Sequence, residues 1–265
     1  TVSNFASFAP LSSLLIVLIG IGIMEKSGFL KTAFTLLTKN AKKYTVTFVL
    51  VLISILLSVI GDLSYIILIP ISAILFKYGK RNPALGIIAT FAGLTCGSGL
   101  NIILTSVDSS LLSLSNLAAN MIDKNYLMET TSFIFIMSIA VIFLALIITQ
   151  ITEKYIVYKF DKYEIPETEV EEEFSIGKQE KNGLVFAAIA GAIYTLIFLY
   201  TIIPGLPFSG KLLDDSQVFY IDKLFSYNSF FSTGFVFIVT IGFVILGFFY
   251  GIGAKTIKNN KVEVS

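Results

Sequence analysis

The sequence lacks histidine and tryptophan altogether and contains one cysteine, Cys96. Histidine and cysteine are the usual protein ligands of zinc and are common in covalent catalysis. Their scarcity excludes soft-ligand metal centres, histidine bases, Cys–His nucleophiles and a disulfide within the chain. We expect Cys96 to be a small buried residue. Any chemistry is therefore left to carboxylates, hydroxyls, amides and the backbone.

Charged residues are also scarce. They make up 14% of the 265 residues, whereas about a quarter of the residues in a soluble domain are charged. The 19 Lys and Arg residues nearly cancel the 18 Asp and Glu residues, so the charge does not favour a nucleic-acid partner. Hydrophobic residues, in contrast, make up 55% of the chain, and the mean hydropathy is +0.84. The composition is typical of an integral membrane protein, whose partner is the lipid bilayer.

Four apolar runs predict ordinary transmembrane helices, because a spanning helix needs about 20 mostly apolar residues. The runs cover residues 11–24, 133–151, 184–203 and 230–254. We place the corresponding spans within residues 1–24, 124–152, 183–203 and 229–254.

Residues 45–79 differ from these spans because a polar tip divides their apolar run. Gly61-Asp62-Leu63-Ser64 separates two apolar limbs at 45–60 and 65–76. Two full spans would need each limb to cross in only about 12 to 16 residues, which is short for a bilayer. We therefore predict a re-entrant helical hairpin.

Residues 80–123 predict a broken transmembrane helix. The apolar stretch 83–94 is interrupted by Thr95-Cys96-Gly97-Ser98-Gly99 and resumes at 100–107. Gly97 and Gly99 flank Ser98 and favour an unwound turn with free backbone groups. Lipid does not tolerate such groups, so they are buried in protein or line a polar cavity, where transporters place their sites. The predicted fold class is therefore an all-α polytopic membrane protein with a re-entrant hairpin and a broken helix.

The remaining segments are expected outside the bilayer core. Residues 25–44 read as an interfacial amphipathic helix with an apolar stripe at Leu30, Phe34, Leu37 and Ala41. We predict a cytoplasmic acidic linker at 153–182, an extracytoplasmic loop at 204–228 and a cytoplasmic tail at 255–265. This topology places all basic residues on the cytoplasmic side except Lys124, Lys211 and Lys223, as the positive-inside rule requires.

Two acids, Asp62 and Asp108, lie in the interrupted region. A carboxylate near the bilayer centre costs about 3 kcal/mol, so each suggests a functional site. Asp62, beside Gly61 and Ser64, could bind the coupling ion or could be the N-cap of the returning limb. Asp108 could accept a proton, or could cap the helix after Ser109 and Ser110.

Asn101 follows the Gly-rich break and could contact substrate or ion. Alternatively, its amide could satisfy the backbone left free by Gly97, Ser98 and Gly99. Carboxylate, amide and carbonyl oxygens suit a hard cation, so Na⁺ could bind at Asp62 and Asn101. Ser58 lies one turn before the tip, where its hydroxyl could also simply bond a preceding carbonyl.

Several segments together resemble the p-aminobenzoyl-glutamate transporter family of the AbgT type. The matching runs are Met24-Glu25-Lys26-Ser27-Gly28, residues 61–70, Phe91-Ala92-Gly93, Ser98-Gly99-Leu100-Asn101, Thr152-Glu153-Lys154 and residues 250–258. The resemblance implies a secondary transporter of the ion-transporter superfamily, with two inverted repeats, assembled as a homodimer in a bacterial inner membrane. Such members are described as importing p-aminobenzoyl-glutamate or exporting sulfonamide-like antimetabolites, driven by a cation gradient.

By position, the resemblance places Asp62 on the acid of the first hairpin, Asn101 on the amide of the first broken helix and Asp108 on an acid beyond it. Gly61 stands where relatives usually carry serine, and residues 95–99 are a looser version of their small-residue run. A second hairpin and a second broken helix are not visible, so we expect the chain to be the first half of the fold.

The leading hypothesis is cation-coupled transport of a small organic anion, with Na⁺ or H⁺ as the coupling ion and no other cofactor. A dicarboxylate or amino-acid carrier of the same superfamily is an alternative. A truncated membrane protein without transport activity is another. A membrane enzyme that uses Asp62 and Asp108 as a carboxylate pair is a third, although no further catalytic groups accompany them.

Overall fold

The structure is a computed structural model that describes residues 9–103, 106–128, 131–160, 176–205, 207, 209–226 and 228–257. Throughout these ranges the regular elements are helices, and no strand occurs. The acidic part of the predicted linker, at 167–173, and the tail beyond residue 257 lie outside the described residues.

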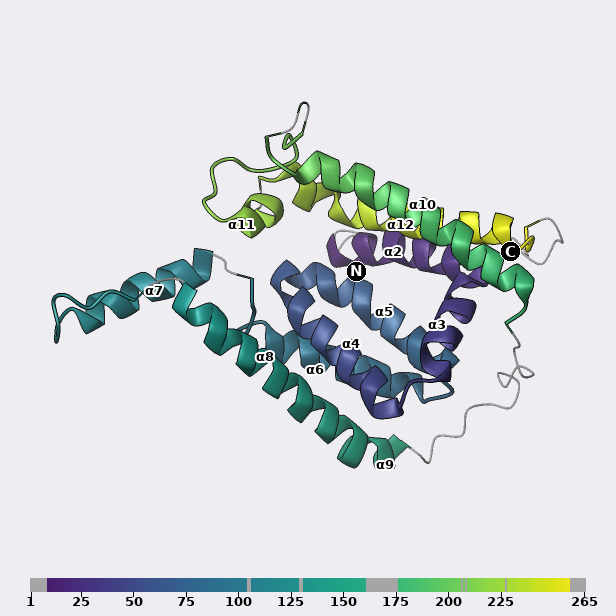
Figure 1. The fold of residues 1–265 in the computed structure, drawn as a ribbon, viewed down its shortest axis with the longest axis horizontal. Coiled ribbons are helices and arrows are strands. Elements are labelled where there is room, and N and C mark those ends of the chain that lie inside the picture. The colour runs from purple at the N-terminus through teal and green to yellow at the C-terminus, as the bar shows by residue number, and fades with distance from the viewer. Residues whose placement is uncertain are drawn as a thin grey trace, which may run out of the picture.

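Three long helices form one side of the molecule (Figure 1). Helix α12 (Phe230–Gly253) packs between α10 (Lys178–Ile202) and α2 (Ala9–Lys26). Glycine allows these close approaches: a Cβ at Gly247 would lie 3.0 Å from the carbonyl oxygen of Ile23. A Cβ at Gly183 would lie 2.8 Å from the Cβ of Ala254. The helices therefore pack with their backbones close together, as is common in membrane proteins.

Helix α3 (Phe29–Lys39) turns away from α2 by 73° at Gly28, whose φ of +88° favours glycine. A separate helix thus follows α2, and it covers Phe29–Lys39, a shorter range than the 25–44 indicated by the sequence. Leu30 is buried, whereas Leu37 is 64% exposed and Ala41 lies beyond the helix. The predicted stripe thus faces the protein only at its beginning.

Helices α4 (Lys43–Leu57) and α5 (Asp62–Tyr78) form the predicted helical hairpin. A 3₁₀ turn, η1 (Ser58–Ile60), ends the first limb, and Gly61 alone separates it from α5. Lys43–Ile60 has 18 residues and α5 has 17. At 1.5 Å per residue the limbs measure about 26 Å, so they are longer than the half-length helices expected from the sequence.

Helix α6 (Pro83–Gly97) packs against both limbs. Asn82 caps it by accepting a hydrogen bond from the Ala84 N–H over 2.9 Å, and Pro83 occupies its first turn. A Cβ at Gly86 would lie 2.5 Å from the Ser72 carbonyl oxygen, and one at Gly93 would lie 2.8 Å from the Ser54 Cβ. Glycine therefore lets α6 approach both limbs closely.

The break after α6 lies later than the sequence predicted. Helix α6 continues through Thr95 and Cys96 to Gly97, residues 98–103 are not helical, and α7 (Ser106–Ala119) follows. Packing on α4 explains the difference, because Gly93 and Gly97 hold this part of α6 against the hairpin. Helix α7 extends away from the bundle (Figure 1).

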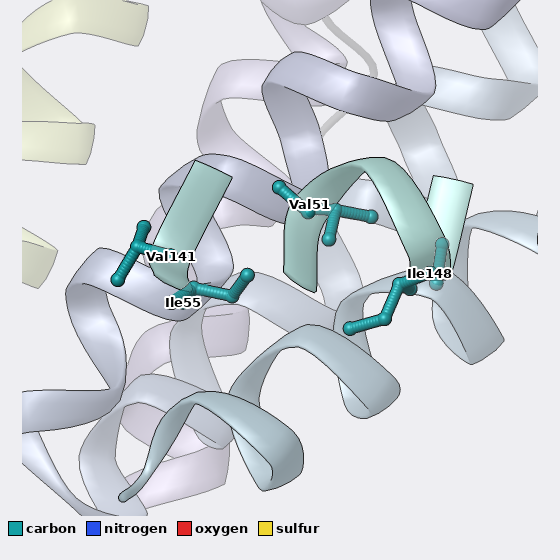
Figure 2. Close-up of a cluster of buried hydrophobic side chains, with 6 residues drawn as sticks. Val51, Ile55, Val141 and Ile148 are labelled. Atoms are coloured by element: carbon teal, nitrogen blue, oxygen red, sulfur yellow. The ribbon is translucent and has the colours of Figure 1, made fainter. Parts of the chain in front are cut away.

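Helix α8 (Thr131–Ile151) closes the other side of the hairpin and continues through a π-helical segment, η2 (Thr152–Ile156), into α9 (Val157–Phe160). Figure 2 shows the core between α4 and α8, where Val51 and Ile55 lie among Val141 and Ile148. These residues are at most 7% exposed. The core fixes the hairpin against α8.

The outer surface agrees with membrane insertion. By length and composition, four described helices could span a bilayer: Lys43–Ile60, Ile134–Phe160, Lys178–Ile202 and Phe230–Gly253. The bent pair Leu11–Lys26 and Phe29–Lys39 could supply a fifth. Phe143, Ile189 and Leu196 are large apolar side chains that face outward, which is typical of lipid contact. The chain is an all-α, multi-pass membrane protein.

Candidate functional site

The hairpin tip depends on Gly61. Its backbone has φ +72° and ψ −140°, a conformation that essentially only glycine adopts without strain. The Ser64 hydroxyl donates to the Gly61 carbonyl oxygen over 2.5 Å, and the Ser64 backbone N–H donates to the same oxygen over 3.1 Å. Gly61 and Ser64, both predicted as site residues, thus shape the turn at the hairpin tip.

Asp62 is exposed and is the first residue of α5. The N-cap of this helix is Gly61, and Asp62 is already within the helix. The alternative that Asp62 is the N-cap is therefore wrong. A carboxylate in the first turn interacts favourably with the positive end of the helix dipole. Asp62 therefore presents a negative charge at the tip.

Asn101 lies beside the end of α4. Its side-chain amide donates to the carbonyl oxygens of Ile55 over 3.2 Å and of Leu56 over 3.1 Å, and it lies 3.5 Å from the Ser58 Oγ. The Asn101 Oδ1 accepts from the Ile103 N–H over 3.2 Å. Asn101 thus binds backbone groups, although at the end of α4 rather than at residues 97–99, where the sequence alternative placed it.

Ser58 bonds a carbonyl of the preceding turn, which is the structural alternative that the sequence suggested for its hydroxyl. Its hydroxyl donates to the Ile55 carbonyl oxygen over 2.7 Å, and the residue is buried. Gly97 lies against the same turn, because a Cβ there would be 2.8 Å from the Ile55 Cα. The structure therefore brings Ser58, Gly97 and Asn101 together around the end of α4.

The rest of the break faces outward. Ser98 and Gly99 are exposed, and the Ser98 hydroxyl donates to the Thr95 carbonyl oxygen over 2.9 Å. A Cβ at Gly99 would have no neighbour within 4 Å. Cys96 is also exposed, contrary to the expectation of a buried thiol, because it lies with the exposed Thr95 on a side of α6 that turns away from the packed Gly93 and Gly97.

Asp108 is not part of this group. It is half-buried in the first turn of α7, which begins at Ser106, so it does not cap a helix that starts after Ser110. Helix α7 leads away from α4, α5 and α6 (Figure 1). Asp108 thus lies on α7 and not on the hairpin or α6.

Two residues that were not considered as site residues connect the tip to the break. The hydroxyls of Tyr65 and Thr95 lie 3.1 Å apart, and the Tyr65 ring meets Phe91 edge to face, with ring centroids 5.8 Å apart. Tyr65 and Phe91 both lie in runs that carry the family resemblance, which was the signal available in the sequence. Tyr65 joins the start of α5 to the last turn of α6.

A cleft of about 360 Å³ opens beside the tip. Val59, Ile60 and Gly61 line it on one side, and Gln217, Asp222 and Ser226 line it on the other. The latter residues belong to α11 (Tyr220–Phe225) and its flanking turns, within the predicted extracytoplasmic loop. The tip therefore has a polar opening next to this loop.

At the opposite end of the hairpin lies a buried ion pair. Arg81 is 8% exposed, and its Nη2 donates to the Glu153 Oε1 over 2.6 Å. Its Nη1 donates to the Thr47 Oγ1 over 2.9 Å, while Thr47 also donates to Glu153. The guanidinium lies 4.4 Å from the centre of the Phe76 ring. These contacts fix the base of the hairpin to η2, a link that the sequence analysis missed.

The oxygen-rich residues suit a hard cation better than a transition metal. The described residues contain no group of three or more His, Cys, Asp or Glu that could hold a metal ion. The Asn101 Oδ1 retains a second lone pair, and Asp62 supplies an exposed carboxylate. Oxygen ligands of these types are the kind that hard cations prefer.

Comparison with known proteins finds a similar transport protein. The p-aminobenzoyl-glutamate transport protein of Escherichia coli (strain K12) is 23% identical over 257 residues, covering 97% of this chain and 48% of that protein. The chain thus spans about half the length of this relative.

Two solved transporters also match, and the chain covers about half of each. The YdaH transporter of Alcanivorax borkumensis is 25% identical, with 98% of this chain and 53% of that one covered and a TM-score of 0.45. MtrF of Neisseria gonorrhoeae, reported with a class of antimetabolite efflux pumps, is 27% identical, with 98% and 52% covered and a TM-score of 0.42. The model of the AbgT putative transporter family matches residues 1–265. The chain belongs to this family.

Proposed function

We propose that this chain forms the first half of a cation-coupled secondary transporter for a small organic anion that resembles p-aminobenzoyl-glutamate. One observation carries the proposal: in a member of a transporter family, Asn101 joins the broken segment after α6 to the end of the first hairpin limb. Transporters use such interruptions of membrane helices to bind solute and ion. Because the family consists of transporters, the membrane-enzyme alternative is set aside.

The charge at the tip suggests how ion and solute are coupled. The N-terminus of α5 carries a partial positive charge that favours a solute carboxylate, but Asp62 in its first turn repels an anion. A cation bound at Asp62, either Na⁺ or H⁺, removes this repulsion. Cation binding would thus raise the affinity for the solute, which is the coupling a carrier needs.

The packing suggests which parts move together. Helix α6 is held closely against both limbs by Gly86, Gly93 and Gly97, so α4, α5 and α6 form one unit. Arg81 and Glu153 join this unit to η2 and hence to α8. We expect these helices to move against the layer of α2, α10 and α12 when the site changes sides.

The setting follows from the same proposal. We place the protein in a bacterial inner membrane, with the hairpin entering from the cytoplasmic side. A second copy would complete a homodimer. The second half of the fold would supply the remaining solute contacts, and these would set the direction of transport and the choice between p-aminobenzoyl-glutamate and a dicarboxylate.

Transport by the full-length polypeptide tests the proposal directly. The protein is reconstituted in liposomes, and uptake of labelled p-aminobenzoyl-glutamate is measured with an imposed Na⁺ gradient, an imposed H⁺ gradient or neither. We expect uptake driven by one gradient. Asp62→Asn should abolish its dependence on the cation, and Asn101→Ala should lower the rate at least tenfold.

Asp123→Asn is the matched control, because this carboxylate is exposed and follows α7, the helix that leads away from the hairpin (Figure 1). It should transport at the parental rate. Absence of gradient-driven flux in either direction, with a dicarboxylate and a sulfonamide tested alongside, would refute coupled transport. Unchanged cation dependence in Asp62→Asn would refute the role of this residue.

A further inference from the structure

Five lysines from two separate turns gather at one corner of the molecule. Lys39, Lys42 and Lys43 lie where α3 ends and α4 begins, and Lys77 and Lys80 lie where α5 turns into α6. All five are exposed. We refer to these five residues as the basic corner.

Direct packing brings the two turns together. A Cβ at Gly79 would lie 3.3 Å from the Thr38 Cγ2, so the α5–α6 turn rests on the end of α3. Thr38, Ala41 and Lys43 share a small cavity of about 30 Å³ with Gly79 and Arg81. The lysines therefore form one surface, although they are about 40 residues apart in sequence.

The charge of this surface is not cancelled by the nearby ion pair. Glu153 is bound to the buried Arg81 over 2.6 Å. Among the described residues, Lys39, Lys42, Lys43 and Lys80 form no ion pair with another described residue. Within the part of the chain that the structure describes, no carboxylate thus neutralises these four positive charges.

Exposed apolar side chains lie next to these charges. Leu36 and Leu37 are 50% and 64% exposed on α3, and Tyr44 is exposed at the start of α4. Helix α3 is bent by 73° from α2, so it cannot continue along the first span. Basic groups beside exposed leucine and tyrosine are typical of a segment at the membrane surface.

We propose that the basic corner binds the headgroup of an anionic phospholipid in the cytoplasmic leaflet, with the acyl chains against Leu36 and Leu37. The charge of the lysines complements the phosphate, and the leucines complement the acyl chains. A basic surface between helices on the cytoplasmic side is suited to an acidic lipid headgroup. Each exposed lysine should strengthen binding about fivefold.

Lys80 offers a variant that removes charge without harming the turn. Its φ of 54° lies in the left-handed region, which asparagine tolerates better than lysine. Lys80→Asn therefore removes one charge while keeping the backbone conformation. Lys39→Gln, Lys42→Gln and Lys43→Gln change exposed side chains, so the fourfold variant should fold normally.

A tryptophan reporter measures lipid binding at this position. These 265 residues contain no tryptophan, so Leu37→Trp introduces a fluorophore beside the basic corner. The parental full-length protein, measured in the same nanodiscs, gives the signal of any other tryptophan, which is subtracted. Full-length protein that carries this substitution is placed in nanodiscs with brominated phosphatidylglycerol or brominated phosphatidylcholine, and the quenching of tryptophan fluorescence is compared between the two lipids. We expect half-maximal quenching at a several-fold lower fraction of phosphatidylglycerol than of phosphatidylcholine.

The fourfold variant, made in the same reporter background, should bring the two quenching curves together. Lys154→Gln with Lys159→Gln, which changes two exposed lysines in η2 and α9, should leave the preference intact. In the reporter protein with all five lysines intact, high salt should also reduce the preference for phosphatidylglycerol over phosphatidylcholine.

Three results would overturn the proposal: equal quenching by both lipids, a preference that survives in the fourfold variant, or an equal loss in the control. Displacement by millimolar inorganic phosphate would instead identify a site for a free anion and would also overturn it.

Discussion

The side-chain amide of Asn101 donates a hydrogen bond to the carbonyl oxygen of Leu56 over 3.1 Å, across 45 residues of sequence. The same nitrogen reaches the carbonyl oxygen of Ile55. These carbonyls lie where α4 gives way to the 3₁₀ turn η1, so the regular α-helical hydrogen bonding ends at them. One side chain thus joins the interrupted end of the hairpin limb to the break after α6.

Removing this amide should destabilise the protein. Asn101→Ala takes a donor away from two partly buried carbonyls, which costs about 1–3 kcal/mol. Asn101→Asp should cost more, because a carboxylate oxygen would face the same carbonyls. Thermal unfolding in detergent measures both, with Asn125→Ala, an exposed position, as the control. Equal melting temperatures for Asn101→Ala and the control would contradict the assignment.

A side chain at Gly61 should strain the hairpin tip. Its φ of +72° with ψ of −140° is unfavourable for alanine, so Gly61→Ala should cost about 1–3 kcal/mol. Gly99→Ala is the matched control, because its φ is not positive and its Cβ would meet nothing within 4 Å. Thermal unfolding should separate the two variants. The explanation fails if they are equally stable.

Breaking the Arg81–Glu153 pair from one side should be costly. Arg81→Ala leaves the largely buried Glu153 carboxylate without its ion-pair partner, so the free energy of unfolding should fall by about 3 kcal/mol. Arg81→Lys should recover only part of this stability, because lysine cannot reproduce both Nη contacts. The double variant with Glu153→Ala should lose less than the sum of the single variants. The Lys223–Asp215 pair, at 3.9 Å and with the Asp215 side chain 90% exposed, is the control and should contribute less than about 1 kcal/mol. Additive losses at Arg81 and Glu153 would rule out coupling.

The loop that holds α11 should depend on pH through Asp214. Hydrogen bonds from Ser216 and Ser226 lower the pKa of this carboxyl from 3.8 to about 2. Because the pKa is lower in the folded state, the stabilisation is complete above 3.8 and is lost as the pH falls through about 2. Hydrogen exchange of residues 214–226 should therefore be constant near neutral pH, after correction for intrinsic rates, and should rise only in that acidic range.

Ser226→Ala tests the cause of this shift, since it removes the donor to the Asp214 Oδ2. The pKa of Asp214 should rise toward its ordinary value, and the increase in exchange should begin at a higher pH. Ser232→Ala, which leaves the Asp214 contacts in place, is the control. An unchanged pH profile in Ser226→Ala would contradict the role of this hydrogen bond.

Local sequence was sufficient for the helices because long apolar runs have few alternatives in a bilayer. The runs at 133–151, 184–203 and 230–254 became α8, α10 and α12. Gly61 divided the hairpin as predicted, but residues 62–64 of the predicted tip belong to α5, and the turn includes residues 58–60 instead. The break after α6 was placed too early, because glycine there serves close packing against Ile55 as well as unwinding. Cys96 was placed inside because residue type does not tell which face of a buried helix turns outward.

The sequence by itself determined the membrane class, the hairpin tip and the family, since apolar length, a glycine between two limbs and ordered motifs are all local features. Only the tertiary structure decided which polar groups meet. It placed Asn101 at the end of α4, joined Arg81 to Glu153 and put Asp108 in the first turn of α7. The physical reason is that these pairings depend on how helices distant in sequence cross and pack, which composition and periodicity along one helix do not specify.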